Sequence, residues 1–534
     1  MKRTFYHSVI AAVAALSMIA CSKEPATDNK DKEPEPEPQG EIEVVTASPE
    51  SGVINERGGS VTITVMANYD WTVTGPAWVK IDPASGPGDK ASHEVVISAE
   101  ANKDAAREGE VVVTLPKGAT ASVKLSQAQF VEQKRPAAIA SAADFELWMK
   151  EFAALDDAGQ VMEITKDINM EGITLAAVPV YFGTLKGNGH KISNLELDHS
   201  LFDSCNGVIE GLTLEASCKL TIPTVDAEAH FGVFAGDNEG TIKGCSTAAA
   251  IGYGASQGAT VYVGGIVGNN LANGTVENCT NSGNIRYASA SDLGAVRLGG
   301  ITANNLGVLK DCTNSGDVVF ASETGSASDK IIAGITGNGK EGTITGCVNR
   351  GRISAEPLAA VTANWYIGGL MGYNTTTDIH DCKNFGDVSA TPTTQKVRIA
   401  ALIGWQNKVD DGKDYTMLEN CVANCKVSAQ CRETGKFPQY EGGNDMLSSG
   451  AMVVGRFNGQ KGKSSNLHFG SEAKPIKLAG TIEFTGDPAA SVVLTAANVT
   501  AYVCGGGSAT NYSCDPAEPN TWQTFCVVYE DVKQ

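Results

Sequence analysis

The segments VENCTNSGNI (276–285) and LKDCTNSGDV (309–318) place a cysteine, an asparagine and a glycine in the same order and at the same spacing. Further copies, some of them degraded, are ITGCVNRGRI (344–353), IHDCKNFGDV (379–388), LENCVANCKV (418–427) and IKGCSTAAAI (242–251). A pattern that returns at a nearly fixed distance is typical of a repeat protein, in which each repeat packs on the next.

Two registers share this period. The cysteines of the pattern stand at positions 245, 279, 312, 347, 382 and 421, so that successive copies are 34, 33, 35, 35 and 39 residues apart. Glycine-rich segments keep step with them: GGIVG from 264, GGITA from 299, AGITG from 333, GGLMG from 368 and AALIG from 400. We therefore predict a solenoid in which each repeat is one coil of a β-helix.

Stacking of the coils explains why the same residue types return. Equivalent positions of neighbouring coils lie ~4.8 Å apart, which is the spacing of paired strands. Residues in register then form ladders, with small thiols inside the coil, bonded amides at the bend, and glycines where the turn needs them. The expected ladder residues are Cys245, Cys279, Cys312, Cys347, Cys382, Cys421, Asn281, Asn314, Asn349 and Asn384. A catalytic group would be needed only once, so these ladders are interpreted as scaffold.

The repeat resembles a known family of motifs. The pattern GGI.G…G.I.NC.N.G.I resembles the GLUG-type repeats of bacterial cell-surface proteins over residues 183–429, and YFGTLKGNGHKISNLEL (181–197) resembles the opening turn of a right-handed β-helix. The resemblance implies an all-β fold whose main part is a right-handed parallel β-helix, which we place at residues 181–430.

The segments on either side of the solenoid are expected to close its ends. In the linker 131–180, residues 140–159 predict a helix that is capped by Ser141 and covers the first coil. Residues 431–534 lose the period but still contain strand-like runs, which we interpret as a C-terminal β cap that hides the open sheet edge.

Each repeat is longer than a minimal coil, so each should carry a protruding arc on one side of the solenoid. The expected arcs are RYASASDLGAVRL (286–298), VFASETGSASDKII (319–332), SAEPLAAVTANWYI (354–367) and SATPTTQKVRIA (389–400). Four aromatic residues lie in or beside them: Tyr287, Phe320, Trp365 and Tyr366. Exposed aromatic rings in a row would suit a glycan or a protein partner. Alternatively, these rings cover the edge of the coil.

A different pattern fills residues 42–130, where short alternating runs between Gly, Pro, Asn and Asp predict an antiparallel β-sandwich. NYDWTVTGPAWVKIDPASGPGD (68–89) and REGEVVVTLPKGATASVKLSQAQ (107–129) resemble a BACON domain, an immunoglobulin-like module common in Bacteroidetes surface proteins. The resemblance implies either carbohydrate binding or a spacer role. Trp71 and Trp78 are candidate platforms for sugar rings, and the alternative, which we favour, is that both pack the sandwich core.

The N-terminus has the form of an export signal. Residues 1–20 combine a basic start with an apolar run that is too short to span a bilayer. SMIAC resembles a bacterial lipobox with Met18 in place of the more usual leucine, which implies lipidation of Cys21. An acidic, proline-rich tether fills residues 21–41 and resembles surface-export signals of Bacteroidetes lipoproteins. We expect a lipid anchor in the outer membrane and a protein that faces the cell exterior.

The charge and the cysteines limit the partners. A formal net charge of −20 disfavours nucleic acid and anionic membrane surfaces. Cys421, Cys425 and Cys431 lack the tight pairing of a zinc motif, so neither a metal nor another cofactor is expected. Thiols in register point the same way, which disfavours disulfides between coils. The disulfide pairing of five cysteines outside the ladder is left open: Cys425, Cys431, Cys504, Cys514 and Cys526.

The hypothesis that the protein is an enzyme is less favoured. Polysaccharide lyases on β-helices need a base with cations or a metal, and hydrolases need convergent carboxylates. Asp311 and Asp381 both precede a ladder cysteine and would stack, but Gly346 holds that place between them. No histidine recurs in register with a basic or acidic cluster, so we predict that the protein is not an enzyme.

The leading hypothesis is a non-catalytic surface lipoprotein. It would bind carbohydrate, such as a glycan or mucin, or a host surface protein through the flank of the β-helix, with the sandwich as spacer or auxiliary binder. The alternatives are an adhesin-like assembly component without a soluble ligand and a β-helix polysaccharide lyase or hydrolase. A concave aromatic groove would favour the binder, a featureless flank the assembly component, and paired carboxylates in a cleft the enzyme.

Overall fold

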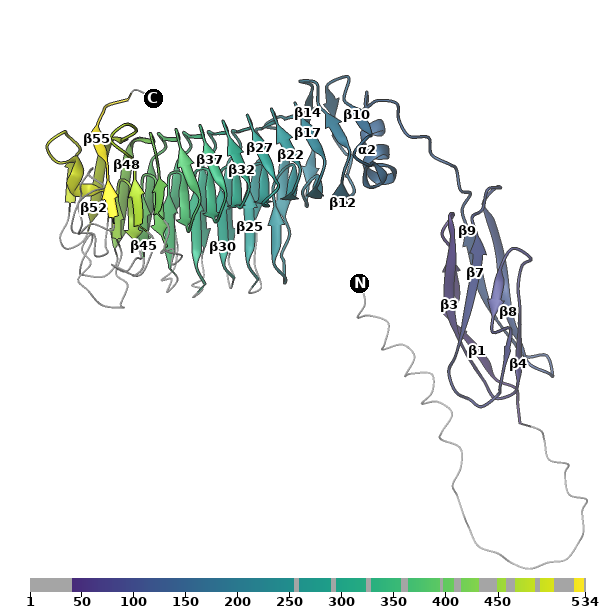
Figure 1. The fold of residues 1–534 in the computed structure, drawn as a ribbon. Helices are drawn as coiled ribbons and strands as arrows, with labels where there is room; N and C mark the ends of the chain where they lie inside the picture. Colours follow the sequence, from purple (N-terminus) through teal and green to yellow (C-terminus); the bar gives the residue numbers. More distant parts are fainter. Residues whose placement is uncertain are drawn as a thin grey trace, which may run out of the picture. The chain divides into compact units, whose positions relative to one another are not determined.

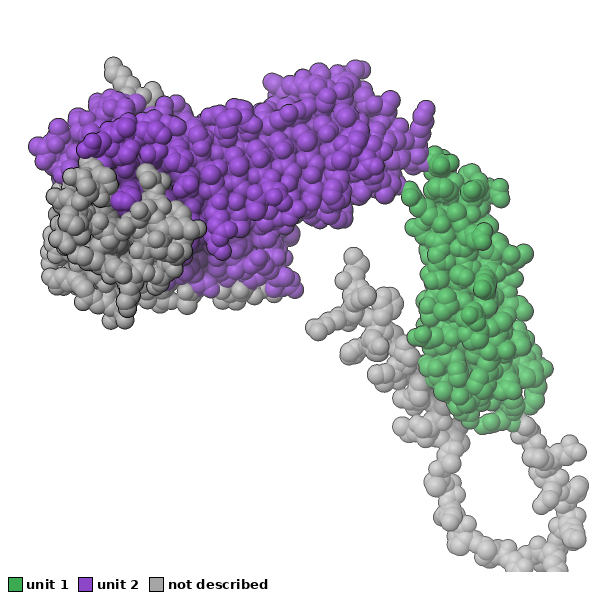
Figure 2. Space-filling model, viewed as in Figure 1, with its two compact units in different colours: residues 1–132 green, residues 133–534 purple. Residues whose placement is uncertain are grey.

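The computed structural model describes residues 41–253, 259–289, 294–322, 328–356, 364–393, 397–407, 414–431, 449–457, 466–485, 490–503 and 523–532. The chain divides into two compact units, Met1–Glu132 and Gln133–Gln534 (Figure 2), and each unit has its own hydrophobic core. The predicted signal peptide, Cys21 and nearly all of the predicted tether lie outside the described residues.

The described part of the first unit is a β-sandwich. One sheet has the order β1 (Val45–Ser48), β3 (Gly58–Ala67), β7 (His93–Glu100) and β5 (Lys80–Asp82). The other has the order β2 (Ser51–Val53), β9 (Thr120–Gln127), β8 (Arg107–Thr114), β4 (Trp71–Thr74) and β6 (Ser85–Gly86). Successive side chains of a strand point to opposite faces, so alternate residues such as Ile63 and Val65 on β3 are fully buried. The predicted sandwich is confirmed.

The second unit is a parallel β-helix, as predicted (Figure 1). One coil runs through β25 (Val261–Gly264), β26 (Val267–Asn270), β27 (Thr275–Glu277), β28 (Thr280–Asn281) and β29 (Ile285–Ser289). Each strand pairs in parallel register with its equivalent in the next coil. At the corner between β25 and β26, a Cβ on Gly264 would press on the backbone of Val267, which explains the small residues of the glycine-rich register.

Two of the long sheets position the candidate site. The seven-stranded sheet consists of β20 (Ala229–Phe231), β25, β30 (Val296–Gly299), β35 (Lys330–Ala333), β40 (Trp365–Gly368), β45 (Val397–Ala400) and β49 (Ser449–Ala451). The nine-stranded sheet consists of β12 (Val178–Tyr181), β16 (Phe202–Cys205), β21 (Ala235–Asn238), β26, β31 (Thr302–Asn305), β36 (Thr336–Gly339), β41 (Met371–Asn374), β46 (Ile403–Gln406) and β50 (Val454–Phe457).

The solenoid is longer at both ends than the predicted range 181–430. The eight-stranded sheet begins at β10 (Val161–Glu163), and β49 and β50 continue two sheets beyond residue 431. These terminal coils lack the full cysteine and asparagine pattern, so the pattern alone does not find them. They are recognised by strand pairing, which keeps the register of the coils beside them.

A single helix closes the first end. Helix α2 (Ala142–Glu151) begins at Ser141, whose side chain accepts a hydrogen bond from the backbone N–H of Asp144, as predicted from the sequence. It ends before the predicted residue 159 and is followed by a short 3-10 turn, η1 (Ala153–Leu155). The buried Trp148 ring packs edge-on against Tyr181 of β12, so the helix covers the first coil (Figure 1).

Inside the coils, the asparagines form a hydrogen-bonded ladder. Asn281 Nδ2 donates to Asn314 Oδ1 (2.9 Å), Asn314 to Asn349 (2.9 Å), and Asn349 to Asn384 (2.7 Å). All four side chains are fully buried, and Asn314 Nδ2 also donates to the carbonyl of Gly316. A buried amide without hydrogen-bond partners would destabilise the fold. Each coil therefore supplies a hydrogen-bond partner for the side-chain amide of the neighbouring coil.

The six ladder cysteines are buried free thiols. Each Sγ lies near backbone carbonyls: Cys312 Sγ is 3.3 Å from the oxygen of Lys310 and 3.5 Å from that of Val276. Hydrogen bonding with Cys279, together with burial, raises the pKa of the Cys312 thiol. The ladder is therefore packed interior, and the Cys312 thiol stays protonated at neutral pH.

Candidate functional site

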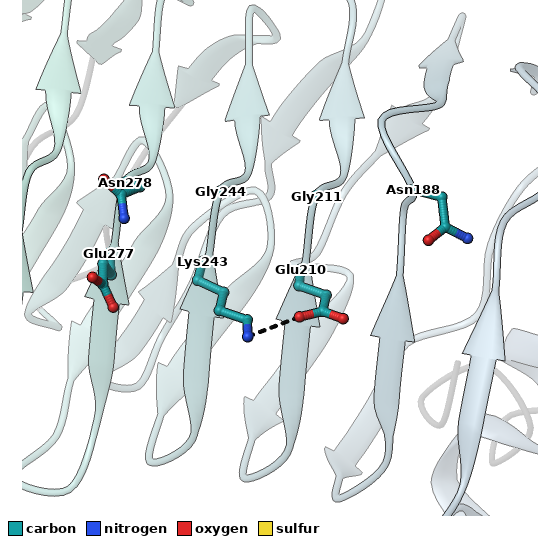
Figure 3. A pocket seen from close by; sticks show the side chains of 7 residues that line it. All are labelled: Asn188, Glu210, Gly211, Lys243, Gly244, Glu277 and Asn278. Atoms are coloured by element: carbon teal, nitrogen blue, oxygen red, sulfur yellow. Dashed lines mark ion pairs between the residues drawn. The ribbon is translucent and has the colours of Figure 1, made fainter.

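Two hollows on the solenoid are candidates for a site. The first, on the outer face of the eight-stranded sheet, encloses about 480 Å³ and is shown in Figure 3. Glu210 of β17 (Val208–Glu210), Lys243 of β22 (Thr241–Lys243) and Glu277 stack in register. Lys243 Nζ lies 2.9 Å from a Glu210 oxygen, as the dashed line in Figure 3 marks. These opposite charges, on an exposed lysine and two half-buried glutamates, neutralise each other along the sheet.

The remaining wall of the first hollow is turn backbone. Asn188, Gly211, Gly244 and Asn278 line it, with φ of 53°, 62°, 59° and 52°. These are left-handed turn residues, a conformation that favours Gly, Asn and Asp. The first hollow is thus the outer surface of a repeated turn, and none of its described lining residues is aromatic.

The same turn explains the two aspartates that precede ladder cysteines. Asp311 and Asp381 have φ of 52° and 57°, and Gly346 between them has φ of 68°. The position therefore selects residue types that tolerate left-handed backbone. Asp311 and Asp381 recur for a conformational reason rather than a chemical one.

The second hollow, which we call the flank groove, encloses about 540 Å³ where the seven-stranded and nine-stranded sheets meet. Its lining residues are Arg297, Asp329, Ile331, Asn338, Lys340, Asn364, Tyr366, Tyr373, Thr375 and Trp405. Strand alternation places them outward. On β30, Val296 and Leu298 are in the core and Arg297 lies between them on the other face.

Three aromatic side chains form one end of the groove. Tyr366 of β40, Tyr373 of β41 and Trp405 of β46 come from two successive coils. The ring of Tyr366 lies 4.5 Å from that of Trp405, and the Tyr373 ring lies edge-on to Trp405 at 5.3 Å. Tyr373 and Trp405 are partly exposed, so their surfaces are available at the groove wall.

A polar cluster holds this aromatic end in place. Asn364 Nδ2 donates to Asp329 (2.8 Å), and the Tyr366 hydroxyl donates to the same carboxylate (3.4 Å). Burial and the nearby Asp329 charge raise the pKa of Tyr366, so the phenol stays protonated at neutral pH. Asn364 in turn accepts a hydrogen bond from Arg398 (2.9 Å).

Arginine side chains surround the aromatic end. The Arg398 guanidinium lies over the rings of Tyr366 (5.3 Å) and Trp405 (5.6 Å), and that of Arg456 lies 5.7 Å from the Trp405 ring. Arg398 is fully buried, and this burial lowers its pKa to about 10. It therefore remains charged at neutral pH and places a fixed positive charge behind the groove.

An outward amide ladder extends from the groove toward the N-terminal coils. Asn338 Nδ2 donates to Asn304, Asn304 to Asn269 (2.8 Å), and Asn269 to Asp237 (3.0 Å). Beside it, Tyr262 lies under the Arg297 guanidinium (5.0 Å). The amide ladder and the Tyr262–Arg297 pair thus extend the polar surface of the groove toward the N-terminal coils.

Two buried donors of the groove meet no acceptor among the described residues. They are the Nε of Arg297 and the indole Nε1 of Trp405. Buried polar groups are almost always hydrogen-bonded, so donors of this kind in a groove are suited to a polar ligand.

Three of the aromatic residues predicted to form an exposed row lie elsewhere. Tyr287, Phe320 of β34 (Val318–Ser322) and Trp365 are buried inside the coil, with the rings of Tyr287 and Phe320 stacked at 4.9 Å and Trp365 edge-on to Phe320 at 4.9 Å. The exposed-row prediction is wrong for these three, because strand alternation turns them inward. Tyr366 alone faces the groove, although its neighbours leave it only 2% exposed. The tips of the predicted arcs lie outside the described residues.

In the sandwich, Trp71 is not available as a sugar platform. It is 1% exposed and belongs to the hydrophobic core, which agrees with the favoured alternative and leaves Trp71 out as a candidate platform for a sugar ring. Trp78 is partly buried, and the Arg107 guanidinium covers its ring at 4.5 Å. Arg107 also donates to the buried Gln127, so Trp78, Arg107 and Gln127 form one structural cluster.

The groove residues that the sequence analysis did not single out can be recognised from a pattern of alternation. In MGYN (371–374) and IGWQ (403–406), a bulky outward residue precedes a buried polar one, and ANN (303–305) shows the same alternation. Asn374 donates to Gln406 (2.9 Å) in a second interior amide ladder. The residue before each inward amide is therefore the outward one.

Two further features bear on cofactors and membranes. Within the described ranges, no group of three or more His, Cys, Asp or Glu side chains could hold a metal ion. Among these residues there is also no helix long and apolar enough to cross a membrane. Cys425 is buried, whereas Cys504, Cys514 and the side chain of Cys431 lie outside the described part of the chain.

Together, the sandwich and the ladder-bearing β-helix define a modular repeat protein. A family model described as "The GLUG motif" matches residues 259–286 and 363–389, each of which runs through most of one coil. A second, the BACON model described as "Putative binding domain, N-terminal", matches residues 69–128. The chain carries a BACON domain followed by GLUG repeats on a β-helix, as the sequence predicted.

Comparisons with individual proteins give weaker likenesses. No curated protein matches the chain. A Bacteroides ovatus GH5 xyloglucanase in complex with a XXXG heptasaccharide is 19% identical over 22% of this chain and 26% of its own, with a TM-score of 0.16. A structure titled "putative immunoglobulin A1 protease from Bacteroides ovatus" is 15% identical over 60% of this chain and 84% of its own, with a TM-score of 0.32. Neither likeness bears on the activity of this protein.

Proposed function

We propose that this protein is a non-enzymatic, lipid-anchored surface protein that binds a polysaccharide or a glycosylated host surface protein in the flank groove. The single observation that carries the proposal is the groove itself. It combines partly exposed aromatic rings, Tyr373 and Trp405, with amide and charged groups held by hydrogen bonds. Sugars present apolar ring faces and hydroxyl edges, which aromatic faces and side-chain amides complement.

The chemistry of the groove supports binding rather than turnover. A hydrolase needs two convergent carboxylates, whereas Asp329 is the one carboxylate among the described lining residues. Asp329 already accepts hydrogen bonds from Asn364 and Tyr366. A tyrosine base would need a lowered pKa, and that of Tyr366 is raised.

Affinity electrophoresis of the full chain against mucin and a panel of plant and host polysaccharides tests this function. We expect at least one polymer to retard the protein without becoming shorter over time. Tyr373→Ala and Trp405→Ala should abolish the retardation. Phe182→Ala, which removes a ring that is 48% exposed outside the groove, should not. Shortening of the polymer would indicate an enzyme. Equal loss of retardation in all three variants would show that the polymer does not bind in the groove.

The anchor needs its own test, because Cys21 lies outside the described residues. Cells grown with labelled palmitate should transfer label to the protein, and Cys21→Ala should remove the label. Protease added to intact cells should degrade the anchored protein if it faces the exterior. Protection from the protease would instead indicate a periplasmic orientation.

A further inference from the structure

The charge of the flank groove differs in sign from that of the chain. The formal net charge of the protein is −20. In contrast, the described lining residues contain two cations, Arg297 and Lys340, and one carboxylate, Asp329. The Arg398 and Arg456 guanidinium groups lie beside the Trp405 ring. A local positive field on an acidic protein attracts an anionic partner and repels a cationic one.

The hydrogen bonds of the groove engage the Asp329 carboxylate more fully than Arg297, while the exposed Lys340 pairs with Glu341 (3.4 Å). The Asp329 carboxylate accepts from Asn364 Nδ2 and the Tyr366 hydroxyl, which ties it into the wall. Arg297 Nε is buried and meets no acceptor among the described residues. Because a guanidinium fork matches a carboxylate with two parallel N–H donors, Arg297 is suited to hold one.

The groove is elongated along the solenoid axis. Its lining residues come from four successive coils, from Arg297 on β30 to Trp405 on β46. Three steps of ~4.8 Å give a track of about 14 Å. A track of this length suits an extended chain better than a single small anion.

On these grounds, and resting on the proposed function, we propose that the flank groove binds a polysaccharide whose sugars carry carboxylates, that is, a uronate-containing glycan. Arg297 and Lys340 hold a carboxylate at one end of the groove. Tyr373 and Trp405 contact a neighbouring sugar ring at the other end. The amides of Asn338 and Asn364 lie between these two ends at hydroxyl-bearing positions of the glycan.

The proposal is tested with the full chain and three polymers: polygalacturonate, the same polymer fully methyl-esterified, and dextran sulfate. We expect polygalacturonate to bind at least about tenfold more tightly than the ester, and its affinity to fall as salt is raised. Arg297→Gln and Lys340→Gln should each weaken polygalacturonate binding about tenfold. Lys383→Gln, which makes the same charge change at an exposed lysine outside the groove, should leave it unchanged.

The outcomes separate this proposal from the proposed function. Equal binding of the acid and the ester would overturn the uronate assignment while leaving a glycan-binding groove. Equal binding of dextran sulfate, lost to the same extent in Arg297→Gln, would show recognition of anions in general and would also overturn it. Binding of none of these polymers and of no glycan in the wider panel would overturn both. Because Lys340 is exposed, Lys340→Gln keeps the test valid even if Arg297→Gln does not fold.

Discussion

Trp365 and Tyr366 are neighbours in the chain, yet their rings lie on opposite faces of strand β40. Trp365 packs edge-on against Phe320 in the interior at 4.9 Å, whereas Tyr366 packs against Trp405 on the outside at 4.5 Å. Strand alternation thus assigns one aromatic residue to the stability of the coil and the next to the candidate site. The aromatic end of the groove exists because the following coil supplies Trp405 in register beside Tyr373.

The interior amide ladder should make a large contribution to stability. Asn314→Ala removes a side chain that accepts from Asn281 and donates to Asn349 and Gly316, and it leaves their buried groups without partners. We expect a loss of about 2–4 kcal/mol in the free energy of unfolding, measured with urea. Ser315→Ala, at the exposed next position, is the control and should change it by less than about 0.5 kcal/mol. Similar losses in both variants would contradict the ladder's role.

The left-handed turn position should tolerate Asn and Gly but not a β-branched residue. Asp311 has φ of 52° and is exposed, so Asp311→Asn and Asp311→Gly should leave the thermal midpoint nearly unchanged. Asp311→Val should cost about 1–2 kcal/mol, because a β-branched side chain is strained there. If Asp311→Asn also lowered stability by this amount, the carboxylate itself would be required, and a chemical role of Asp311 would be supported.

The ladder thiols should be inert in the folded protein. Hydrogen bonding with Cys279, together with burial, raises the pKa of Cys312, and only the thiolate reacts readily with iodoacetamide. Mass spectrometry of peptides containing Cys312 and Cys347 should show no labelling at pH 8 in buffer and complete labelling in urea. Phe182→Cys, at a position 48% exposed, supplies a thiol that should be labelled quickly in buffer. Rapid native labelling of Cys312 would mean that the coils open.

Stability should depend on pH through His230 on β20. Burial lowers the pKa of this histidine, but the hydrogen bond and charge of Asp237, 2.8 Å away, outweigh burial, with Glu228 adding to them, so the pKa is raised above 6.5. The added stability is therefore fully present below about pH 6.5 and is lost as the pH rises through the raised value.

We accordingly expect His230→Gln to lower the free energy of unfolding more at pH 5.5 than at pH 8.5, with a difference of less than about 1 kcal/mol. Asp237→Asn should remove most of this pH dependence, because Glu228 remains 3.4 Å from the imidazole. A larger effect of His230→Gln at pH 8.5 would contradict the assignment.

Much of the fold could be predicted from the sequence, because a residue pattern that is weak evidence in one repeat becomes strong evidence when it recurs at a fixed spacing. The spacing of Cys279, Cys312 and Cys347, together with the asparagine two residues after each, indicated the coil length and the interior ladders. The terminal coils could not be predicted in this way, because their strands keep the register but lack the repeated cysteines and asparagines.

The candidate site was less predictable than the fold. The sequence pointed to aromatic residues beside the arcs and included Tyr366, but it grouped that residue with Tyr287, Phe320 and Trp365, which face the core. Adjacent aromatic residues give no sign of which one faces inward until the strand's phase is known. That phase is set by pairing with the neighbouring coils.

The amino-acid sequence by itself determined the period, the parallel β-helix, the ladder residues and the sandwich that precedes them, because each depends on local residue types repeated at fixed spacing. Only the tertiary structure decided which side chains meet at the flank groove. Arg297, Asp329, Tyr366 and Trp405 come from four different coils. They become neighbours only when stacked strands, ~4.8 Å apart, bring distant segments into one register.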